Sequence, residues 1–445
     1  MSANLKGLRF FIKTFGCQMN ENDSEHVAGL LVEAGASKAL SAEESDIILV
    51  NTCAVRKKSE EKIYSFLGRL SPLKKDGGKV IGVLGCVAQI RREELFKKRP
   101  EIDFIVGPDH YHELASLLSR KREGKLLKTS WNRAWHEIGS AQTLRESRGS
   151  AYVPIMEGCN NFCAYCVVPF GRGREKCRPM DSVREEVLDL AANGYGEIQL
   201  LGQNVNSYRD PGTGEDFAGL LRVVSRIEGI EWIRFITSHP KDLSPAIART
   251  MSDRPNICRH LHLPLQSGST AVLARMNRGY TREEYLEKVG LLKGLMPDIA
   301  LSTDIIVGFP GETDSDFEET LDILKKIEFV NMFSFRYSPR PQTAAAGIED
   351  DIPLEVKRKR LIVLQDAQKE IQLARNRALI GKTFKVLCLG ESKKGGGRYS
   401  GRNEGFQVVN FSSPRNVRDR FVDVLITGCG PYSLHGETLN GQTAA

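Results

Sequence analysis

The chain reads Met156-Glu157-Gly158-Cys159-Asn160-Asn161-Phe162-Cys163-Ala164-Tyr165-Cys166 in the segment around which the rest is arranged. The thiols of Cys159, Cys163 and Cys166 have the spacing C-x3-C-x2-C. A four-iron cluster that only carries electrons is held by four protein thiolates. Three thiolates on one short loop leave one iron without a protein ligand and therefore open to a small molecule. The spacing predicts a 4Fe-4S cluster of this open kind.

A zinc ion is the alternative occupant of this loop. Structural zinc takes four ligands in tetrahedral geometry, and Cys177 could supply the fourth thiolate. Zinc-binding thiols usually come as C-x2-C pairs separated by longer segments, however, and this loop does not follow that pattern. A disulfide within the loop is less favoured still, so the iron–sulfur interpretation is preferred.

The composition is that of a soluble protein with more than one domain. A chain of 445 residues has room for about two to four domains. Charged residues make up 27% and hydrophobic residues 41%, and the net charge of +7 permits a nucleic-acid partner. We find no signal peptide and no apolar run long enough to span a membrane. We therefore expect a cytoplasmic protein with reduced thiols, in which clustered cysteines bind metal.

The N-terminal part, residues 1–119, alternates short apolar runs with helix-like segments. This alternation is typical of a doubly wound parallel sheet of the α/β class. The expected strands are Leu8–Thr14, Asp46–Asn51, Lys79–Gly85 and Asp103–Val106.

A cysteine follows each of the first three expected strands, namely Cys17, Cys53 and Cys86. Ligands of open α/β sheets bind beyond the carboxyl ends of the strands, so these thiols should converge on one edge of the sheet. Lone core cysteines are the alternative. The shared position after a strand favours a second site with three thiols.

Residues 120–150 are expected to form a linker. They contain eight Lys or Arg residues against three Glu residues, with Trp131 and Trp135 among them. A solvated connector is the simplest interpretation, and a strip that contacts a polyanion is the alternative.

Residues 151–380 resume the α/β alternation on a longer scale. Six strand–helix units predict an open, partial (β/α)6 barrel, followed by a long helix from Pro353 to about Leu379. Three Gly-containing turns would lie at the carboxyl ends of barrel strands and line a cofactor. These turns are Gly202-Gln203-Asn204, Gln266-Ser267-Gly268 and Gly308–Glu312. The expected strands are Ala151–Glu157, Glu197–Leu201, Trp232–Ile236, Arg259–Leu263, Leu301–Val307 and Phe329–Phe335.

Residues 381–445 are expected to form a small antiparallel β-barrel, with strands at Lys382–Leu389, Gly405–Phe411 and Phe421–Thr427. Nine Lys or Arg residues against five acidic ones give this segment a net charge of +4. Aromatic residues such as Phe406 and Tyr432 add stacking surfaces. This combination favours RNA binding, with scattered surface lysines as the alternative.

Together these motifs resemble the methylthiotransferase family of the radical S-adenosylmethionine (SAM) class across essentially the whole chain. The blocks that carry the resemblance are Gly16–Asn20, Asn51–Arg56, Gly85–Gln89 and Glu157–Arg174. The C-terminal segment resembles the TRAM RNA-binding domain of these enzymes. Gly16–Asn20 resembles the branch that acts on tRNA carrying N6-dimethylallyladenosine. Sister branches, which act on threonylcarbamoyladenosine in tRNA or on a ribosomal protein, stay as alternatives.

The resemblance implies two 4Fe-4S clusters, one on the loop cysteines and one on Cys17, Cys53 and Cys86, with SAM bound at the first. It implies that Tyr165 packs near the SAM adenine and that Gly202-Gln203-Asn204 holds the methionine amine. An amide stands there where other radical SAM proteins have an acid. Weaker candidates for ribose or adenine contact are Gln266, Ser267 and Asp304. Cys177 departs from the serine expected at that position.

The resemblance also implies partners and a reaction. The expected partners are the anticodon stem-loop of tRNA, a flavodoxin- or ferredoxin-like electron donor and a supplier of sulfur or clusters, with the protein itself a monomer. The expected reaction methylates a cluster-bound sulfide and then replaces the adenine C2–H by C–SCH3. Both clusters should therefore face one cavity that receives the unstacked adenine. A non-catalytic iron–sulfur sensor that binds RNA is the alternative from a different class.

Overall fold

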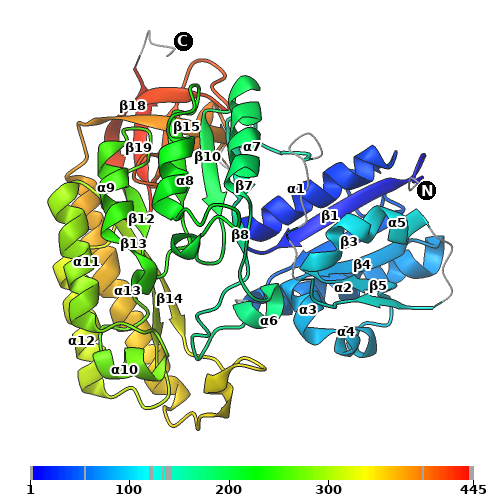
Figure 1. Ribbon diagram of the computed structural model, residues 1–445, viewed down its shortest axis with the longest axis horizontal. Helices are drawn as coiled ribbons and strands as arrows, with labels where there is room; N and C mark the ends of the chain where they lie inside the picture. Colours follow the sequence, from blue (N-terminus) through cyan, green and yellow to red (C-terminus); the bar gives the residue numbers. More distant parts are fainter. Residues whose placement is uncertain are drawn as a thin grey trace.

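The computed structural model describes residues 4–54, 57–119, 124–132, 135, 143–392 and 395–439. Figure 1 shows three parts: an N-terminal α/β unit in blue and cyan, a larger α/β unit in green and yellow, and a C-terminal barrel in orange and red. Much of the expected linker, at residues 120–123, 133–134 and 136–142, lies outside the described residues, as do Lys393 and Lys394.

The N-terminal unit is the predicted doubly wound parallel sheet. Its six strands have the order β2-β1-β3-β4-β5-β6, and every neighbouring pair is parallel. Every residue of β3 is buried, as expected for a strand covered on both faces. The strands are β1 (Arg9–Phe15), β2 (Ser37–Lys38), β3 (Ile47–Thr52), β4 (Val80–Gly85), β5 (Phe104–Val106) and β6 (Leu126–Lys128).

Helices cover both faces of this sheet and enclose two separate apolar clusters. Phe10 belongs to the cluster on one side, and Ile48 and Val50 belong to the cluster on the other. The helices are α1 (Gln18–Glu33), α2 (Lys57–Gly77), α3 (Cys86–Arg91), α4 (Glu93–Lys98), η1 (Pro108–Glu113) and α5 (Leu114–Ser119). The short edge strands β2 and β6 were not predicted, because two or three residues show no periodicity.

The central unit is the predicted partial barrel. It consists of two parallel three-stranded sheets, β11-β10-β7 and β12-β13-β14. A single parallel bridge from Ile233 to Ile257 links them. The strands are β7 (Ser150–Pro154), β10 (Glu197–Leu201), β11 (Trp232–Phe235), β12 (His260–His262), β13 (Ala300–Val307) and β14 (Asn331–Arg336).

Helices line the outside of the partial barrel and bury one large apolar cluster against it. They are α7 (Met180–Ala192), α8 (Phe217–Val224), α9 (Pro245–Asp253), α10 (Thr270–Arg275), α11 (Arg282–Leu295), α12 (Asp314–Ile327) and the long α13 (Leu354–Arg377). The predicted strand Ala151–Glu157 is divided. It ends as β7 at Pro154, and β8 (Met156–Glu157) pairs antiparallel with β9 (Lys176–Cys177).

The C-terminal unit is a closed five-stranded barrel of order β15-β16-β17-β19-β18. The prediction of a small antiparallel barrel is confirmed, with β17 and β19 as its one parallel pair among the described residues. Strand direction cannot alternate all the way around a ring with an odd number of strands, so one pair must be parallel. The strands are β15 (Thr383–Glu391), β16 (Arg398–Asn403), β17 (Val408–Ser412), β18 (Phe421–Cys429) and β19 (Leu434–Thr438).

Arg234 of β11 fastens this barrel to the central unit. Its side chain is almost fully buried and pairs with Glu197 of β10 at 2.5 Å. The same guanidinium donates to the backbone carbonyls of Glu404 at 2.6 Å and Asn403 at 2.8 Å. Phe406 packs beside it and stacks on His260 with a ring-centroid distance of 5.1 Å. The turn between β16 and β17 is therefore held against the inner strands of the partial barrel.

Replacing Arg234 with alanine should destabilise the protein by about 3–5 kcal/mol, because Glu197 is left buried without its ionic partner. Urea unfolding would measure this change in stability. Arg259→Ala is the matched control, since its ion pair with Asp298 is largely exposed and should contribute no more than about 1 kcal/mol. Equal effects of the two substitutions would contradict the anchoring role of Arg234.

Candidate active site

The first group of thiols lies at the carboxyl edge of the N-terminal sheet, as predicted. Cys17 follows β1 and caps the start of α1, Cys53 follows β3, and Cys86 opens α3 directly after β4. The Cys53 thiol is hydrogen-bonded to Cys17, and Cys86 interacts electrostatically with Cys17. Cys17 is exposed, whereas the other two are buried. The three sulfurs share one site that is open to solvent at the Cys17 side.

Two asparagines fix the loops that carry Cys17 and Cys53. The Asn20 side chain accepts a hydrogen bond from the Cys17 sulfur at 3.4 Å and donates to the Asn51 side chain at 3.1 Å. Asn51 in turn donates to the backbone carbonyl of Asn20 at 2.8 Å. Gly85 has a φ of +92°, and a Cβ there would lie 2.5 Å from the Asn51 side chain. Glycine is therefore required for the turn that leads to Cys86.

The second group of thiols lies on the loop between β8 and α6 (Val168–Arg172). Cys163 is buried, and its sulfur lies 3.2 Å from Nη1 of Arg278 and 3.8 Å from Nε2 of His239. The backbone N–H of Val168 donates to the Cys166 sulfur at 3.5 Å. Cys163 is close enough to contribute to the raised pKa of both Cys159 and Cys166. The loop thus gathers its three sulfurs and surrounds them with hydrogen-bond donors.

The thiols differ in acidity within the first group as well as between the groups, since burial raises the pKa of Cys86. Hydrogen bonding from Cys53 lowers the pKa of Cys17 to about 6, and the charge of Arg172 contributes. Burial raises the pKa of Cys159 to about 11 and that of Cys166 to about 12. Metal binding requires thiolates, so binding at the loop must release protons.

Both donor sets fit iron–sulfur clusters. Each set offers three thiols, and N–H donors point at the Cys86, Cys163 and Cys166 sulfurs. A cluster joins each thiolate to a different iron, so its ligands lie further apart than those of one ion. Among the residues that the structure describes, no three His, Cys, Asp or Glu side chains could hold a single metal ion.

Cys177, the proposed fourth zinc ligand, is engaged elsewhere. It lies on β9, packs against the apolar cluster of the partial barrel and accepts a hydrogen bond from the backbone N–H of Arg209 at 3.5 Å. The structure gives it a packing role beside the loop.

The predicted SAM contacts lie near the carboxyl ends of the barrel strands. The Gln203 side chain accepts a hydrogen bond from the backbone N–H of Gly158 at 2.5 Å, so this turn supports the cysteine loop directly. Asn204 accepts from the backbone N–H of His239 at 3.0 Å and donates to Asp242 at 2.7 Å. Tyr165 packs against an apolar cluster that includes Phe309. No ligand contact tests these roles, and they stay predictions.

The weaker candidates Gln266, Ser267 and Asp304 also contact other residues of the chain. Ser267 is fully buried and accepts a hydrogen bond from the backbone N–H of Ser269 at 3.3 Å. The backbone N–H of Gln266, which has a φ of +75°, donates to the Asp304 carbonyl at 2.8 Å. The Asp304 carboxylate lies 3.4 Å from Nε2 of His262. Their contacts with the ribose or adenine stay predictions.

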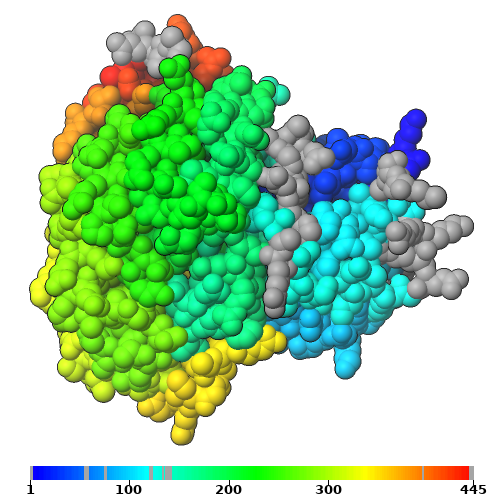
Figure 2. Space-filling view, viewed as in Figure 1, coloured from blue at the N-terminus to red at the C-terminus, as the bar shows by residue number. Residues whose placement is uncertain are grey.

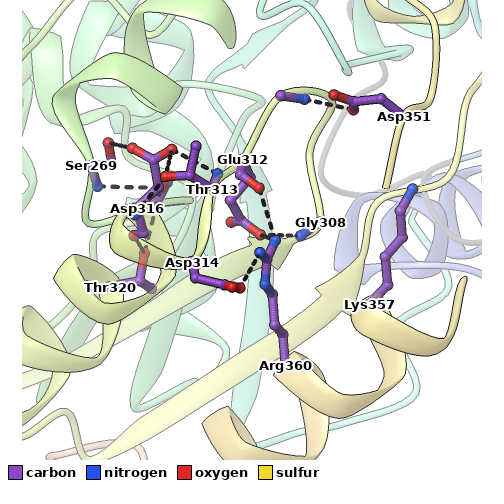
Figure 3. A network of polar contacts seen from close by, with 12 residues as sticks. Ser269, Gly308, Glu312, Thr313, Asp314, Asp316, Thr320, Asp351, Lys357 and Arg360 are labelled. Atoms are coloured by element: carbon purple, nitrogen blue, oxygen red, sulfur yellow. Dashed lines mark hydrogen bonds and ion pairs between the residues drawn. The ribbon is translucent and has the colours of Figure 1, made fainter. Parts of the chain in front are cut away.

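The turn Gly308–Glu312 is anchored by the long helix α13, as Figure 3 shows. The buried Glu312 carboxylate accepts from the backbone N–H of Gly308 at 2.6 Å and from Arg360 at 2.8 Å. Arg360 also donates to Asp314 at 2.7 Å. Lys357 packs on Gly308, where a Cβ would lie 2.4 Å from its side chain. α13 therefore fixes this turn, which the sequence predicts to line a cofactor.

Three residues beside the thiols were missed by the sequence reasoning: Arg172, His239 and Arg278. Arg278, between α10 and α11, and His239, after β11, both contact Cys163, and no spacing rule links them to the cysteine loop. Arg172 contacts Cys86 at 3.3 Å and lies within the quoted block Glu157–Arg174. A basic residue so close to Cys166 in the chain was the one signal available.

The fold and the thiol loop define a class of protein. The Radical SAM superfamily model matches residues 153–324, and the model of the Uncharacterized protein family UPF0004 matches residues 9–107. The fold resembles that of the radical S-adenosylmethionine methyltransferase TsrM from Kitasatospora setae, solved with cobalamin and a [4Fe-4S] cluster bound. That chain is 15% identical, with a TM-score of 0.55 and 77% of each chain covered. Membership of this superfamily implies SAM and iron–sulfur cofactors.

Relatives with the same full-length organisation specify the family. The tRNA-2-methylthio-N(6)-dimethylallyladenosine synthase of Solibacter usitatus is 43% identical over 442 residues, with 98% of each chain covered. The synthase of the same name from Pelodictyon phaeoclathratiforme is 46% identical over 430 residues, with 96% of this chain and 98% of the relative covered. The chain belongs to the family of tRNA-2-methylthio-N(6)-dimethylallyladenosine synthases, a radical SAM methylthiotransferase family, as the resemblance predicted.

Replacing Gly158 with alanine should abolish cluster assembly on the adjoining cysteine loop. Gly158 has a φ of +79°, and a Cβ there would lie 2.1 Å from the Arg174 carbonyl oxygen. Iron analysis after anaerobic reconstitution should give about four iron atoms per chain where the unaltered protein binds about eight. Gly290→Ala in α11, where nothing lies within 4 Å, is the control and should retain the full iron content. Full iron content in Gly158→Ala would refute this steric requirement.

Proposed function

We propose that the protein is a tRNA methylthiotransferase that converts N6-dimethylallyladenosine in tRNA to its 2-methylthio derivative. The observation that carries this proposal is the direct packing of α6 on α3. Figure 1 shows these two helices side by side where the N-terminal and central units meet. A Cβ added to Gly171 of α6 would lie 3.1 Å from the Cys86 Cβ. The segment after the loop cysteines thus touches the other thiol site, which suits a reaction that needs both.

In this proposal Cys159, Cys163 and Cys166 hold the cluster that binds SAM, and Cys17, Cys53 and Cys86 hold the auxiliary 4Fe-4S cluster. When bound, the clusters and SAM supply the radical chemistry and the sulfur that replacing an aromatic C–H bond requires. The chain's residues stabilise the thiolates and hold the two sites in place. The same proposal assigns SAM binding to Tyr165, Gly202, Gln203, Asn204, Gln266, Ser267 and Asp304.

Helix α1 of the N-terminal unit contacts the partial barrel. These contacts support the proposal that both thiol sites face one cavity. Gln18, next to Cys17, donates to the Gln199 side chain of β10 at 3.2 Å. The Tyr152 hydroxyl of β7 donates to Glu21 at 2.8 Å. These contacts lie beside Cys17, the exposed member of its site. An adenine unstacked from the RNA would enter here, between the two groups of thiols.

The basic C-terminal barrel is proposed to bind the anticodon stem-loop of the tRNA. Exposed basic residues occur on several of its strands and turns, including Lys382, Arg398, Arg415 and Arg420. Such residues contact phosphates, which gives affinity and positions the RNA. Because Arg234 fastens this barrel to the partial barrel, RNA held here would have a fixed relation to the thiol sites.

Further proposals concern organisation and partners. The functional division follows residues 1–119, 120–150, 151–380 and 381–445, with β6 of the 120–150 segment completing the N-terminal sheet. The protein would act as a cytoplasmic monomer, with a flavodoxin- or ferredoxin-like electron donor and a supplier of sulfur or clusters. Within the part of the chain that the structure describes, no helix has the length and apolar character needed to cross a bilayer.

Anaerobic incubation of the reconstituted protein with SAM, a reductant and tRNA bearing N6-dimethylallyladenosine should give the 2-methylthio nucleoside together with 5′-deoxyadenosine. Mass spectrometry of nucleosides would detect both. Cys17→Ala should lose the methylthio product while 5′-deoxyadenosine still forms, and Cys163→Ala should lose both. Formation of 5′-deoxyadenosine without methylthio product by the unaltered protein would refute the proposed substrate and favour a sister methylthiotransferase. Absence of both from fully loaded protein would favour the iron–sulfur sensor.

The double substitution Arg398→Gln and Arg415→Gln should weaken tRNA binding and make it less sensitive to salt. Removing one charge that pairs with a phosphate should reduce the slope of log affinity against log salt by about 0.7–0.9. Fluorescence anisotropy at several salt concentrations would measure this. The control is the double substitution Arg222→Gln and Arg358→Gln. It removes the same charge from two helices of the central unit, at residues that are also exposed. If both double variants bind tRNA alike, the C-terminal barrel is not the RNA-binding surface.

A further inference from the structure

Arg172 is a buried arginine that connects the two thiol sites. It ends α6, shortly after Cys166 in the chain, and is only 3% exposed. Its Nε donates to the Cys86 sulfur at 3.3 Å. The rest of its guanidinium donates to the Asp23 carboxylate of α1 at 3.2 and 2.5 Å. One side chain of the central unit therefore contacts both α1, which begins at the Cys17 cap, and Cys86.

The orientation of this guanidinium is fixed on several sides. The bidentate contact with Asp23 aligns its plane. Glu157, which directly precedes Gly158, lies 3.7 Å away on the side of the cysteine loop. Gly171 lets the helix approach closely enough, since a Cβ would meet the Cys86 Cβ at 3.1 Å and Ile90 at 3.3 Å. Arg172 thus has one available direction for its Nε proton, toward the Cys86 sulfur.

A second arginine of the central unit approaches the same thiols from another direction. Arg340, in the segment after β14, lies 3.9 Å from Glu60 of α2 and interacts electrostatically with Cys53. Figure 2 shows this yellow part of the chain against the N-terminal unit. The auxiliary thiols therefore have two cationic neighbours contributed by the central unit.

We propose that Arg172 is a positioning residue that hydrogen-bonds the Cys86 sulfur, raises the reduction potential of the auxiliary cluster and fixes that cluster relative to the SAM-binding loop. This inference rests on the proposed assignment of Cys17, Cys53 and Cys86. A reduced cluster carries more negative charge than an oxidised one. Hydrogen bonds to its sulfurs and a nearby cation therefore stabilise the reduced form and raise the potential.

The test isolates the auxiliary cluster in the full-length protein. Cys159, Cys163 and Cys166 are all replaced with alanine, so that any remaining 4Fe-4S signal comes from the other site. EPR-monitored redox titration then gives the midpoint potential of the auxiliary cluster in this parent protein. The same titration is made on variants of the parent that also carry Arg172→Gln, Arg172→Lys or Arg145→Gln. Arg145 is the matched control, because it forms a comparably buried ion pair with Glu186 at 2.5 Å. Glu186 belongs to α7, a helix of the central unit that carries no cysteine.

Arg172→Gln should shift the midpoint to a lower potential and alter the EPR line shape of the reduced cluster. Arg172→Lys keeps the charge and should restore part of that shift, and Arg145→Gln should leave the potential unchanged. If Arg172→Gln takes up no cluster, Arg172→Lys provides the test. A midpoint potential below that of the parent would support the inference, and an unchanged midpoint would overturn it. A midpoint equal to that of the parent in the Arg172 variants, or an equal shift in Arg145→Gln, would overturn the inference.

A second readout uses the chain with all six cysteines. Arg172→Gln should form less methylthio nucleoside for each 5′-deoxyadenosine released, because the SAM-binding loop is intact while the auxiliary cluster is misplaced. An unchanged ratio would contradict the positioning role. If the unaltered protein makes no methylthio product from this tRNA, the proposed function fails, and the redox titration still decides the role of Arg172 by itself.

Discussion

The buried contact between Arg172, Asp23 and Cys86 holds the two halves of the site together. Removing one partner of a buried ion pair typically costs about 3–5 kcal/mol, because the other charge is left buried without compensation. Unlike an apolar contact, this ion pair also fixes the orientation of the Arg172 side chain, because the two N–H groups of a guanidinium meet a carboxylate in one plane. That plane directs Nε at the Cys86 sulfur. Another contact between the units, from Gln18 to Gln199, lies on the same helix α1.

The N-terminal sheet and the partial barrel position their thiols in the same way. Parallel sheets place functional groups beyond the carboxyl ends of their strands. Cys17, Cys53 and Cys86 occupy that edge of the N-terminal sheet, and the cysteine loop leaves the corresponding edge of the partial barrel. α6 packs on α3, so the segment after the cysteine loop touches the helix that begins at Cys86. The C-terminal barrel is fastened by Arg234, so RNA bound there would meet a fixed target.

The sequence predicted the elements with clear periodicity and missed those without it. β3, β4, β10 and β13 were predicted to within one residue or so at each end, because most of their residues are buried and apolar. β16 and β19 were missed, since Arg398–Asn403 and Leu434–Thr438 contain few apolar residues. Their pairing is decided by barrel closure, a long-range constraint that local sequence does not express.

The sequence by itself determined the chemistry: six cysteines in two groups, each group with a position or spacing that indicates a shared ligand. It also placed the cysteines after strands, because local hydrophobic patterning is enough to locate strand ends. Only the tertiary structure decided which other side chains serve the thiols. Arg172, His239 and Arg278 reach the sulfurs from separate segments. Burial strengthens such contacts by excluding water, and burial is a property of the packed units, which no single segment carries.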